Sequence, residues 1–220
     1  MNAHLLEALR LFKAPRRLNG NLFYAHKQRD FDSAPLHPEM EEKRRRLMEI
    51  ARRGKSLLEI GVNGGHSLLP AKHANPDLQC TGIDICRQID PSWGRVDIYT
   101  PAAMAWLKER FPGDFTFLVG DSRLKAPEFA VTHEGPPIDI LHVDGAKETY
   151  LRDIVNLLPV LHDKSLIVVD DTQLRVVRRT VRRLVAAGLA RRHPDYPDDG
   201  TEKYQHIVLH PVDERPGAGA

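Results

Sequence analysis

The architecture follows from residues 56–67, which read Ser56-Leu57-Leu58-Glu59-Ile60-Gly61-Val62-Asn63-Gly64-Gly65-His66-Ser67. A short apolar run ends at a carboxylate, enters a turn with three glycines in five residues, and opens into a helical pattern. Glycine is needed where the backbone takes a positive φ, or where a ligand approaches main-chain atoms too closely for a Cβ. The segment therefore predicts a strand, a tight loop and a helix, with a ligand bound over the loop.

The spacing of the glycines narrows the kind of ligand. Glu59-x-Gly61-x-x-x-Gly65 is not the Gly-x-Gly-x-x-Gly pattern of dinucleotide sites, and no Gly-Lys-Ser/Thr follows it. A pyrophosphate or triphosphate is therefore disfavoured, and with it an NAD-dependent enzyme. A nucleotide-like ligand of another kind is the natural candidate. The alternative is an ordinary glycine-rich turn of any doubly wound domain.

Length, composition and charge point to one domain. The 220 residues are 41% hydrophobic and 28% charged, enough for a single substantial core. A formal charge of +2 gives no broad electrostatic reason to expect nucleic acid. No apolar stretch reaches the roughly twenty residues that span a bilayer, so we expect no membrane segment. The spacing of Cys80 and Cys86 fits neither a metal site nor a disulfide framework, which suits a cytoplasmic location.

The glycine turn resembles the first motif of class I S-adenosylmethionine-dependent methyltransferases. The resemblance implies an α/β fold with a doubly wound, mostly parallel, seven-stranded Rossmann-like sheet. We expect an N-terminal helical extension over residues 1–54, acting as a cap, a substrate lid or a cover for the sheet edge. The methyltransferase domain should span residues 55–211, and residues 212–220 should form a flexible tail. Expected strands cover 55–60, 78–83, 115–119, 138–143, 165–169 and 204–210, the last antiparallel, and a short strand followed by a loop is expected over 191–199.

The same resemblance assigns residues to S-adenosylmethionine. Glu59 ends the first strand, where these enzymes carry an acid near the amino-acid end of the ligand. Asp84 ends the second strand and is placed to accept both hydrogen bonds of a ribose diol. The segment after the third strand would receive the adenine. The full expected set is Glu59, Gly61, Asn63, Gly65, Ser67, Asp84, Gly120, Asp121, Ser122 and Asp144.

Three carboxylates follow two strands that should be neighbours in the sheet. They are Asp144, Asp170 and Asp171. Like charges in a cleft repel each other unless protons or a cation compensate, and hard oxygen ligands suit Mg²⁺, with Mn²⁺ or Ca²⁺ as substitutes. The alternative is that the Asp170-Asp171 pair caps a helix expected over 172–187.

A second motif supports the metal. The spacing Asp144-x-x-Lys147-x-x-Tyr150, followed later by Asp170-Asp171, resembles metal-dependent catechol and caffeoyl-coenzyme A O-methyltransferases. In those enzymes the acid binds the metal, the lysine is the candidate base, and an Asp-Asn pair completes the site. Asp171 departs from that pattern and is closer to the magnesium-dependent macrolide and aminocoumarin sugar O-methyltransferases. Related enzymes often form homodimers.

We therefore expect a Mg²⁺-dependent O-methyltransferase acting on a small vicinal diol, catechol-like or sugar-like. Lys147 and Asp144 are the expected catalytic residues, and Lys147 can serve as base if the metal and burial lower its pKa. His142 is better explained as a core histidine, and His66 and His37 are weaker base candidates. Two alternatives stay open: a methyltransferase-like binding protein without turnover, and a methyltransferase that uses a non-diol acceptor without metal.

Overall fold

The computed structural model describes residues 41–89, 96–197 and 206–212. The strands are β1 (Ser56–Ile60), β2 (Gln79–Asp84), β3 (Phe115–Val119), β4 (Ile138–Val143), β5 (Leu161–Val169), β6 (Ala190–Arg192) and β7 (Ile207–Pro211). The helices are α2 (Glu41–Ala51), α3 (Leu68–Ala74), α4 (Val96–Arg110), α5 (Ser122–Thr132), α6 (Tyr150–Leu157) and α7 (Arg175–Ala186), with a 3₁₀ turn at Leu158–Val160. Most of the expected N-terminal extension, His37 and nearly all of the tail lie outside the described residues.

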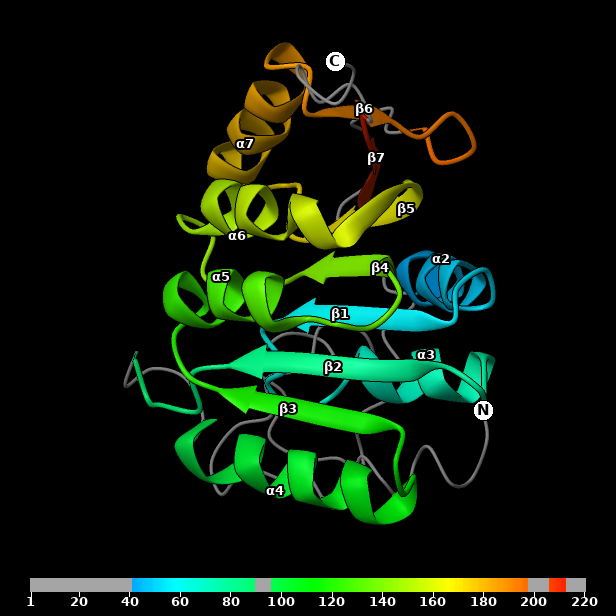
Figure 1. Ribbon diagram of the computed structural model, residues 1–220, viewed down its shortest axis with the longest axis vertical. Coiled ribbons are helices and arrows are strands. Elements are labelled where there is room, and N and C mark those ends of the chain that lie inside the picture. Colours follow the sequence, from blue (N-terminus) through cyan, green and yellow to red (C-terminus); the bar gives the residue numbers. More distant parts are fainter. Residues whose placement is uncertain (1–40, 90–95, 198–205, 213–220) are drawn as a thin grey trace.

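The strands form one seven-stranded sheet in the order β3-β2-β1-β4-β5-β7-β6. The first five strands along the chain pair in parallel, whereas β7 pairs antiparallel with both β5 and β6. In Figure 1 the arrowheads of β1 to β4 point to the same side, which is the carboxyl edge of the sheet. The predicted doubly wound, mostly parallel sheet is confirmed, including the antiparallel strand near the end of the chain.

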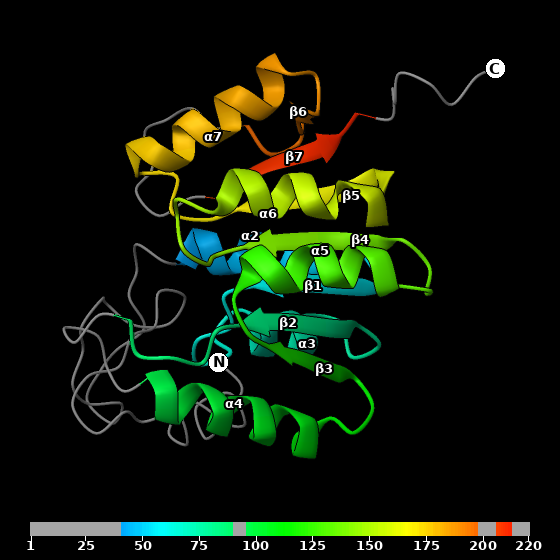
Figure 2. The same ribbon diagram turned by 60° about the vertical axis from the view of Figure 1, so that its left-hand side comes forward.

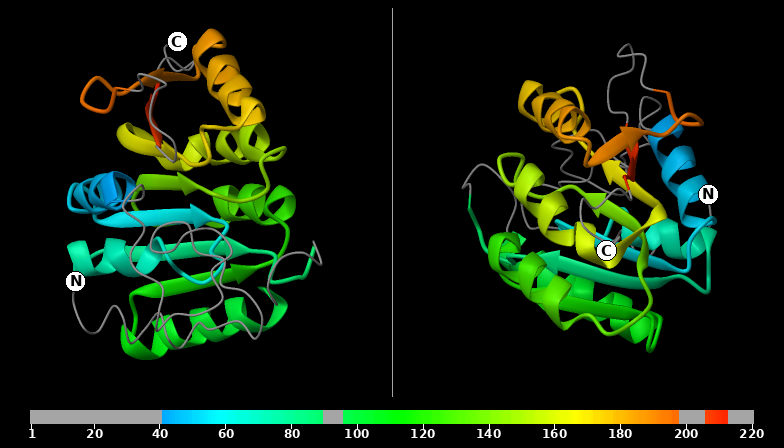
Figure 3. Two further views of the ribbon diagram at one scale, coloured as in Figure 1. Left: turned by 180° about the vertical axis from the view of Figure 1, so that it is seen from behind. Right: turned by 45° about the horizontal axis from the view of Figure 1, so that its top comes forward.

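Helices cover both faces of the sheet, which explains why the central strands β1, β4 and β5 are largely buried. Figure 2 shows α5 and α6 in front of the strands, with α2 and α3 behind them, and the two views of Figure 3 agree. Two core clusters correspond to these faces. One holds side chains of α2, α3 and α4, and the other those of α5, α6 and α7. Within the described ranges, no helix is both long and apolar enough to cross a membrane.

Helix α2 belongs to the core of the domain. Leu47, Ile50 and Ala51 are completely buried and share a cluster with β1, α3 and α4. Lys43 lies one turn before Leu47 on the same face and is also buried. The chain that precedes β1 is thus anchored to the sheet from residue 43 onward, by both apolar contacts and a buried charge.

Two predicted helix starts were wrong. The pair Thr100-Pro101 predicts an N-cap followed by a first-turn proline, and so a helix that starts at Thr100. The helix instead begins at Val96 and runs through Pro101. Pro101 is the sixth residue of this helix, so it lies beyond the first turn and removes one intrahelical hydrogen bond. The helix expected from Thr172 begins at Arg175, after an N-cap at Leu174 that has no side-chain cap. The carboxylates of Asp170 and Asp171 are therefore not used to cap α7.

Gly61 is required by packing against the neighbouring loop. Its φ is 91°, and a Cβ at this position would lie 2.5 Å from the carbonyl oxygen of Asp144. Gly113 also has a positive φ, of 85°, yet a Cβ there would meet nothing within 4 Å. Both glycines would incur the cost of a left-handed backbone when replaced by alanine, but only Gly61 would also incur a steric clash.

We predict that Gly61→Ala destabilises the fold more than Gly113→Ala. Each substitution carries a left-handed backbone cost of about 1–2 kcal/mol, and crowding against Asp144 adds about 1–3 kcal/mol at Gly61 alone. Urea unfolding of the unchanged protein and of the two variants gives the loss of unfolding free energy that each substitution causes. Equal losses of stability would show that the loop containing Asp144 simply moves away.

Candidate active site

Backbone hydrogen bonds place the predicted residues along one edge of the sheet. Each bond joins the backbone N–H that follows one strand to a backbone carbonyl oxygen of the neighbouring strand. The pairs are Gly120 to Asp84 (2.8 Å), Gly61 to Ile83 (2.8 Å), Asp144 to Ile60 (2.8 Å) and Asp170 to Val143 (3.1 Å). The carboxyl ends of β3, β2, β1, β4 and β5 are therefore joined side by side. Ligands of open α/β sheets bind at this edge.

Asp84 holds the glycine loop in place. One of its carboxylate oxygens accepts hydrogen bonds from the backbone N–H groups of Val62 (2.8 Å) and Asn63 (2.9 Å), and the other from that of Cys86 (2.7 Å). Asn63 and Cys86 both have a positive φ, of 50° and 48°. The Asp84 carboxylate thus stabilises two tight turns on either side of the predicted ribose site.

Glu59 lies inside the fold rather than at its surface. It is completely buried, accepts a short hydrogen bond from the Ser67 hydroxyl, and lies 2.7 Å from Nδ1 of His142. Burial raises the pKa of Glu59, although the contacts with His142 and Ser67 oppose that shift. Glu59 and Ser67, both predicted to bind the cofactor, are brought together, and their contact ties the end of β1 to the start of α3.

The segment after β3 begins helix α5. Asp121 is the N-cap of that helix, and its carboxylate accepts from the backbone N–H of Arg123 at 2.9 Å. The same carboxylate forms an ion pair with the Arg123 guanidinium at 2.5 Å, which lowers the pKa of Asp121. Gly120 lies beside Asp84 through the backbone bond given above. Gly120, Asp121 and Ser122 are therefore next to the end of β2, where an adenine ring would lie in the predicted arrangement.

Lys147 bridges two of the three predicted metal ligands. Its Nζ lies 3.0 Å from Asp144 and 2.6 Å from Asp171, and donates to the Tyr150 hydroxyl at 3.0 Å. Burial alone would lower the pKa of Lys147, but the charges of Asp144 and Asp171 outweigh it and raise that pKa. Burial and the charge of Asp170 raise the pKa of Asp144 to about 6. In this state Lys147 is an ammonium counter-ion, not a base.

Asp170 is enclosed by cationic and aromatic side chains. Lys43 Nζ lies 2.5 Å from its Oδ1, and the Nε2 atoms of His142 and His206 lie 3.8 and 3.7 Å from its Oδ2. Burial would raise the pKa of Asp170, but Lys43 and the two histidines hold it well below its usual value. For His142, burial acts to lower the pKa, yet Asp170 and Glu59 raise it to about 10. Burial lowers the pKa of His206 to about 4.

The three predicted metal ligands do come together. Asp144, Asp170 and Asp171 each offer an oxygen, and these atoms lie within 4.8 Å of one another. Asp171 has a φ of 54°, in the left-handed region that glycine favours and that aspartate adopts less often. Three carboxylates are a donor set that suits a hard divalent cation.

Sequence reasoning missed two residues that contact Asp170. Lys43 begins the basic run 43–46, and a run of basic residues in a helical pattern usually indicates a solvated helix face. Lys43 nevertheless lies four residues before Leu47 and seven before Ile50. That spacing places Lys43 on the apolar side of α2 and was the available signal. His206 directly precedes the apolar strand β7, and nothing in its local pattern connects it with Asp170.

Solved structures of low sequence identity share this fold. The O-methyltransferase TomG from Streptomyces achromogenes, involved in tomaymycin synthesis and solved with S-adenosylmethionine, has 20% identity and a TM-score of 0.59, with 96% of this chain and 90% of TomG covered. An O-methyltransferase from Bacillus cereus, solved with SAH, has 14% identity and a TM-score of 0.61 over 96% and 91%. CalS11, a TDP-rhamnose 3'-O-methyltransferase, has 15% identity and a TM-score of 0.58 over 79% and 81%. The architecture is that of the class I methyltransferases.

Family membership follows from the sequence itself. Residues 58–172, more than half of the chain, match a family described as a methyltransferase domain, and the chain belongs to that family. A comparison with curated proteins finds no match. The matched region runs from β1 through the Asp170-Asp171 pair, so it contains nearly the whole edge described above. The predicted methyltransferase is confirmed.

We predict that Lys43→Met destabilises the protein by about 3–5 kcal/mol, because it leaves the buried Asp170 carboxylate without its closest cation. Arg45→Met on the same helix is the control, since Arg45 is exposed and pairs with Glu42 at the surface. Denaturant unfolding should show little change for Arg45→Met. A similarly small effect of Lys43→Met would mean that the two histidines alone compensate Asp170.

Proposed function

We propose that the protein transfers a methyl group from S-adenosylmethionine to a hydroxyl oxygen of a small molecule with two adjacent oxygens. The observation that carries the proposal is the Asp144-Lys147-Asp171 cluster, in which an amine lies among carboxylates at the ligand-binding edge of a methyltransferase domain. The solved neighbours named as O-methyltransferases support oxygen as the acceptor atom. CalS11, named for a sugar substrate, supports the sugar-like version of the acceptor.

The cofactor would lie across the ends of β1, β2 and β3. Asp84 is the residue proposed to accept the ribose hydroxyls, and Gly120, Asp121 and Ser122 would lie against the adenine. Gly61, Asn63 and Gly65 would form the loop beneath the ligand, with Asp144 at its methyl end. Glu59 and Ser67 would act from behind this loop, because both are buried and bonded to each other. Bound S-adenosylmethionine supplies a methyl group already activated as a sulfonium.

Mg²⁺ fits the donor set of Asp144, Asp170 and Asp171, so we propose these residues as its ligands. When bound, Mg²⁺ would polarise substrate oxygens and lower the pKa of a hydroxyl. Lys147 Nζ is the proposed proton acceptor. It can take a proton only when the carboxylates that now raise its pKa are otherwise neutralised. Tyr150, at 3.0 Å, holds Nζ in position through its hydroxyl.

One observation favours a second candidate, a methyltransferase that works without metal. Lys43 and Lys147 already give each of the three carboxylates an ammonium partner at 2.5–3.0 Å. These lysines could be the permanent counter-ions, in which case the acids position Lys147 and need no divalent ion. Chelation distinguishes the two candidates directly.

We predict that Asp84→Asn weakens S-adenosylmethionine binding about 10–100-fold, because a neutral amide replaces charge-assisted hydrogen bonds. Asp163→Asn is the matched control, because Asp163 lies exposed in β5. Calorimetric titration of each variant gives the dissociation constants. If the unchanged protein does not bind S-adenosylmethionine, the proposed function is wrong.

We predict that chelator-treated protein loses at least about tenfold in methyl transfer to catechol or nucleotide-sugar diols, and that added Mg²⁺ restores it. Full activity after exhaustive chelation would instead support the metal-free candidate. The readout is methylated product measured against time at saturating S-adenosylmethionine.

Lys147→Ala should lower kcat by about 10²–10⁴-fold if Nζ accepts the proton. Lys147→Arg keeps the positive charge but cannot act as a base at neutral pH, so it should lose a similar factor. Lys164→Ala, at an exposed lysine, should behave like the unchanged protein. Activity retained by Lys147→Arg would assign Lys147 a purely electrostatic role.

A further inference from the structure

His206 is a buried imidazole without a hydrogen-bond partner among the described residues. Its side chain is completely inaccessible to solvent, and neither ring nitrogen has a partner there. Nε2 of the equally buried His142 is in the same situation. Buried polar atoms normally find partners, since leaving one unsatisfied costs on the order of 1–3 kcal/mol. Two such nitrogens facing one carboxylate therefore call for an explanation.

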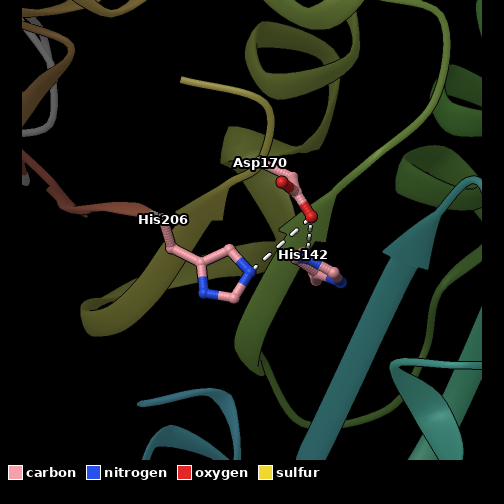
Figure 4. Close-up of side chains that lie close together, drawn as sticks. All are labelled: His142, Asp170 and His206. Atoms are coloured by element: carbon pink, nitrogen blue, oxygen red, sulfur yellow. Dashed lines mark ion pairs between the residues drawn. The ribbon is translucent and has the colours of Figure 1, made fainter. Parts of the chain in front are cut away.

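The distances between these groups suit three ligands of one shared ion. The two Nε2 atoms lie 3.8 and 3.7 Å from Asp170 Oδ2, too far for hydrogen bonds. Metal bonds of about 2.1 Å that meet at about 90–130° separate their ligand atoms by about 3.0–3.8 Å. Figure 4 shows both imidazoles directed at the same Asp170 oxygen, and the two rings are nearly perpendicular, at 89°. An ion between the three groups would satisfy every nitrogen that faces Asp170.

The surroundings of His142 match those of a metal-bound histidine. Such a histidine usually gives its second ring N–H to a carboxylate or carbonyl, which fixes the tautomer and aims the free nitrogen at the metal. His142 Nδ1 lies 2.7 Å from Glu59, and that carboxylate is held in turn by Ser67. The bond to Glu59 leaves Nε2 as the nitrogen that faces Asp170.

We propose that His142, Asp170 and His206 form a buried site for a divalent transition metal such as Zn²⁺. Two imidazoles and one carboxylate suit this class of ion, whereas Mg²⁺ prefers an all-oxygen set. The site is separate in its ligand chemistry from the three-carboxylate cluster, and it does not depend on the proposed methyl transfer.

The proposed ion would join three strands. His142 lies in β4, Asp170 directly follows β5, and His206 directly precedes β7. Lys43 lies on the other oxygen of Asp170, Oδ1, so Oδ2 is left to the two histidines. The ion would thus fix the orientation of Asp170, the one residue that the histidine site shares with the acid cluster.

Titration of metal-stripped protein with Co²⁺, followed by its visible absorption and by calorimetry, tests the site. The unchanged protein should bind Co²⁺, and Zn²⁺ should displace it. His206→Ala should weaken binding by at least about 100-fold, and Glu59→Gln by about 10–100-fold through loss of the outer carboxylate. His210→Ala in β7 should have no effect on Co²⁺ binding.

Two further variants keep the test decisive. His206→Cys retains a ligand, so it should still bind Co²⁺ and add a sulfur-to-metal charge-transfer band; this result holds even if His206→Ala fails to fold. The double variant Asp144→Asn, Asp171→Asn removes the acid cluster and should leave the Co²⁺ spectrum intact. Absence of Co²⁺ binding in the unchanged protein would overturn the proposal. Co²⁺ binding that survives His206→Ala, or that is lost only in the double variant, would also overturn the proposal.

Discussion

The structure depends on compensating the negative charge gathered where β1, β4 and β5 end. Glu59, Asp144, Asp170 and Asp171 converge there, and two of them are completely or almost completely buried. Two like charges about 4 Å apart repel by about 4 kcal/mol even at an effective dielectric constant of about 20. Such an edge is stable only when protons or cations compensate the negative charge. Lys43 and Lys147 meet that need, and each pairs with a different part of the cluster.

This compensation links parts of the chain that are distant in sequence. Lys43 reaches Asp170 across 127 positions, and the rest of the buried face of α2 packs against β1 and α3. The helix before the first strand is thus fixed in relation to the site by both charge and apolar contact. A residue that would be a solvated lysine in an isolated helix becomes part of the site, because the sheet places a buried carboxylate opposite it.

The sheet was predictable because its signals are local. The apolar run 138–143 and the glycine turn at 61–65 each fix an element from a few neighbouring residues, and strand ends then place Asp84, Asp144 and Asp170 on one edge. The partners of Asp170 were not predictable, because Lys43 and His206 contact it only through the tertiary fold. Helix starts were also missed: Pro101 lies within α4, and α7 begins three residues later than expected. In both cases a plausible capping residue was present but unused.

The same compensation connects stability with the proposed chemistry. Lys147 is held protonated by Asp144 and Asp171, so the contacts that stabilise the metal-free site also withhold the amine from catalysis. For Lys147 to act as a base, another cation must take its place beside Asp144 and Asp171. The three-carboxylate cluster allows such an exchange because Lys147 is partly exposed, with 22% of its side chain accessible, whereas Lys43 is almost fully enclosed at 1%. Of the two lysines, Lys147 is therefore the one that can move away from the acids without opening the core, and Lys43 is the one whose charge stays with the fold.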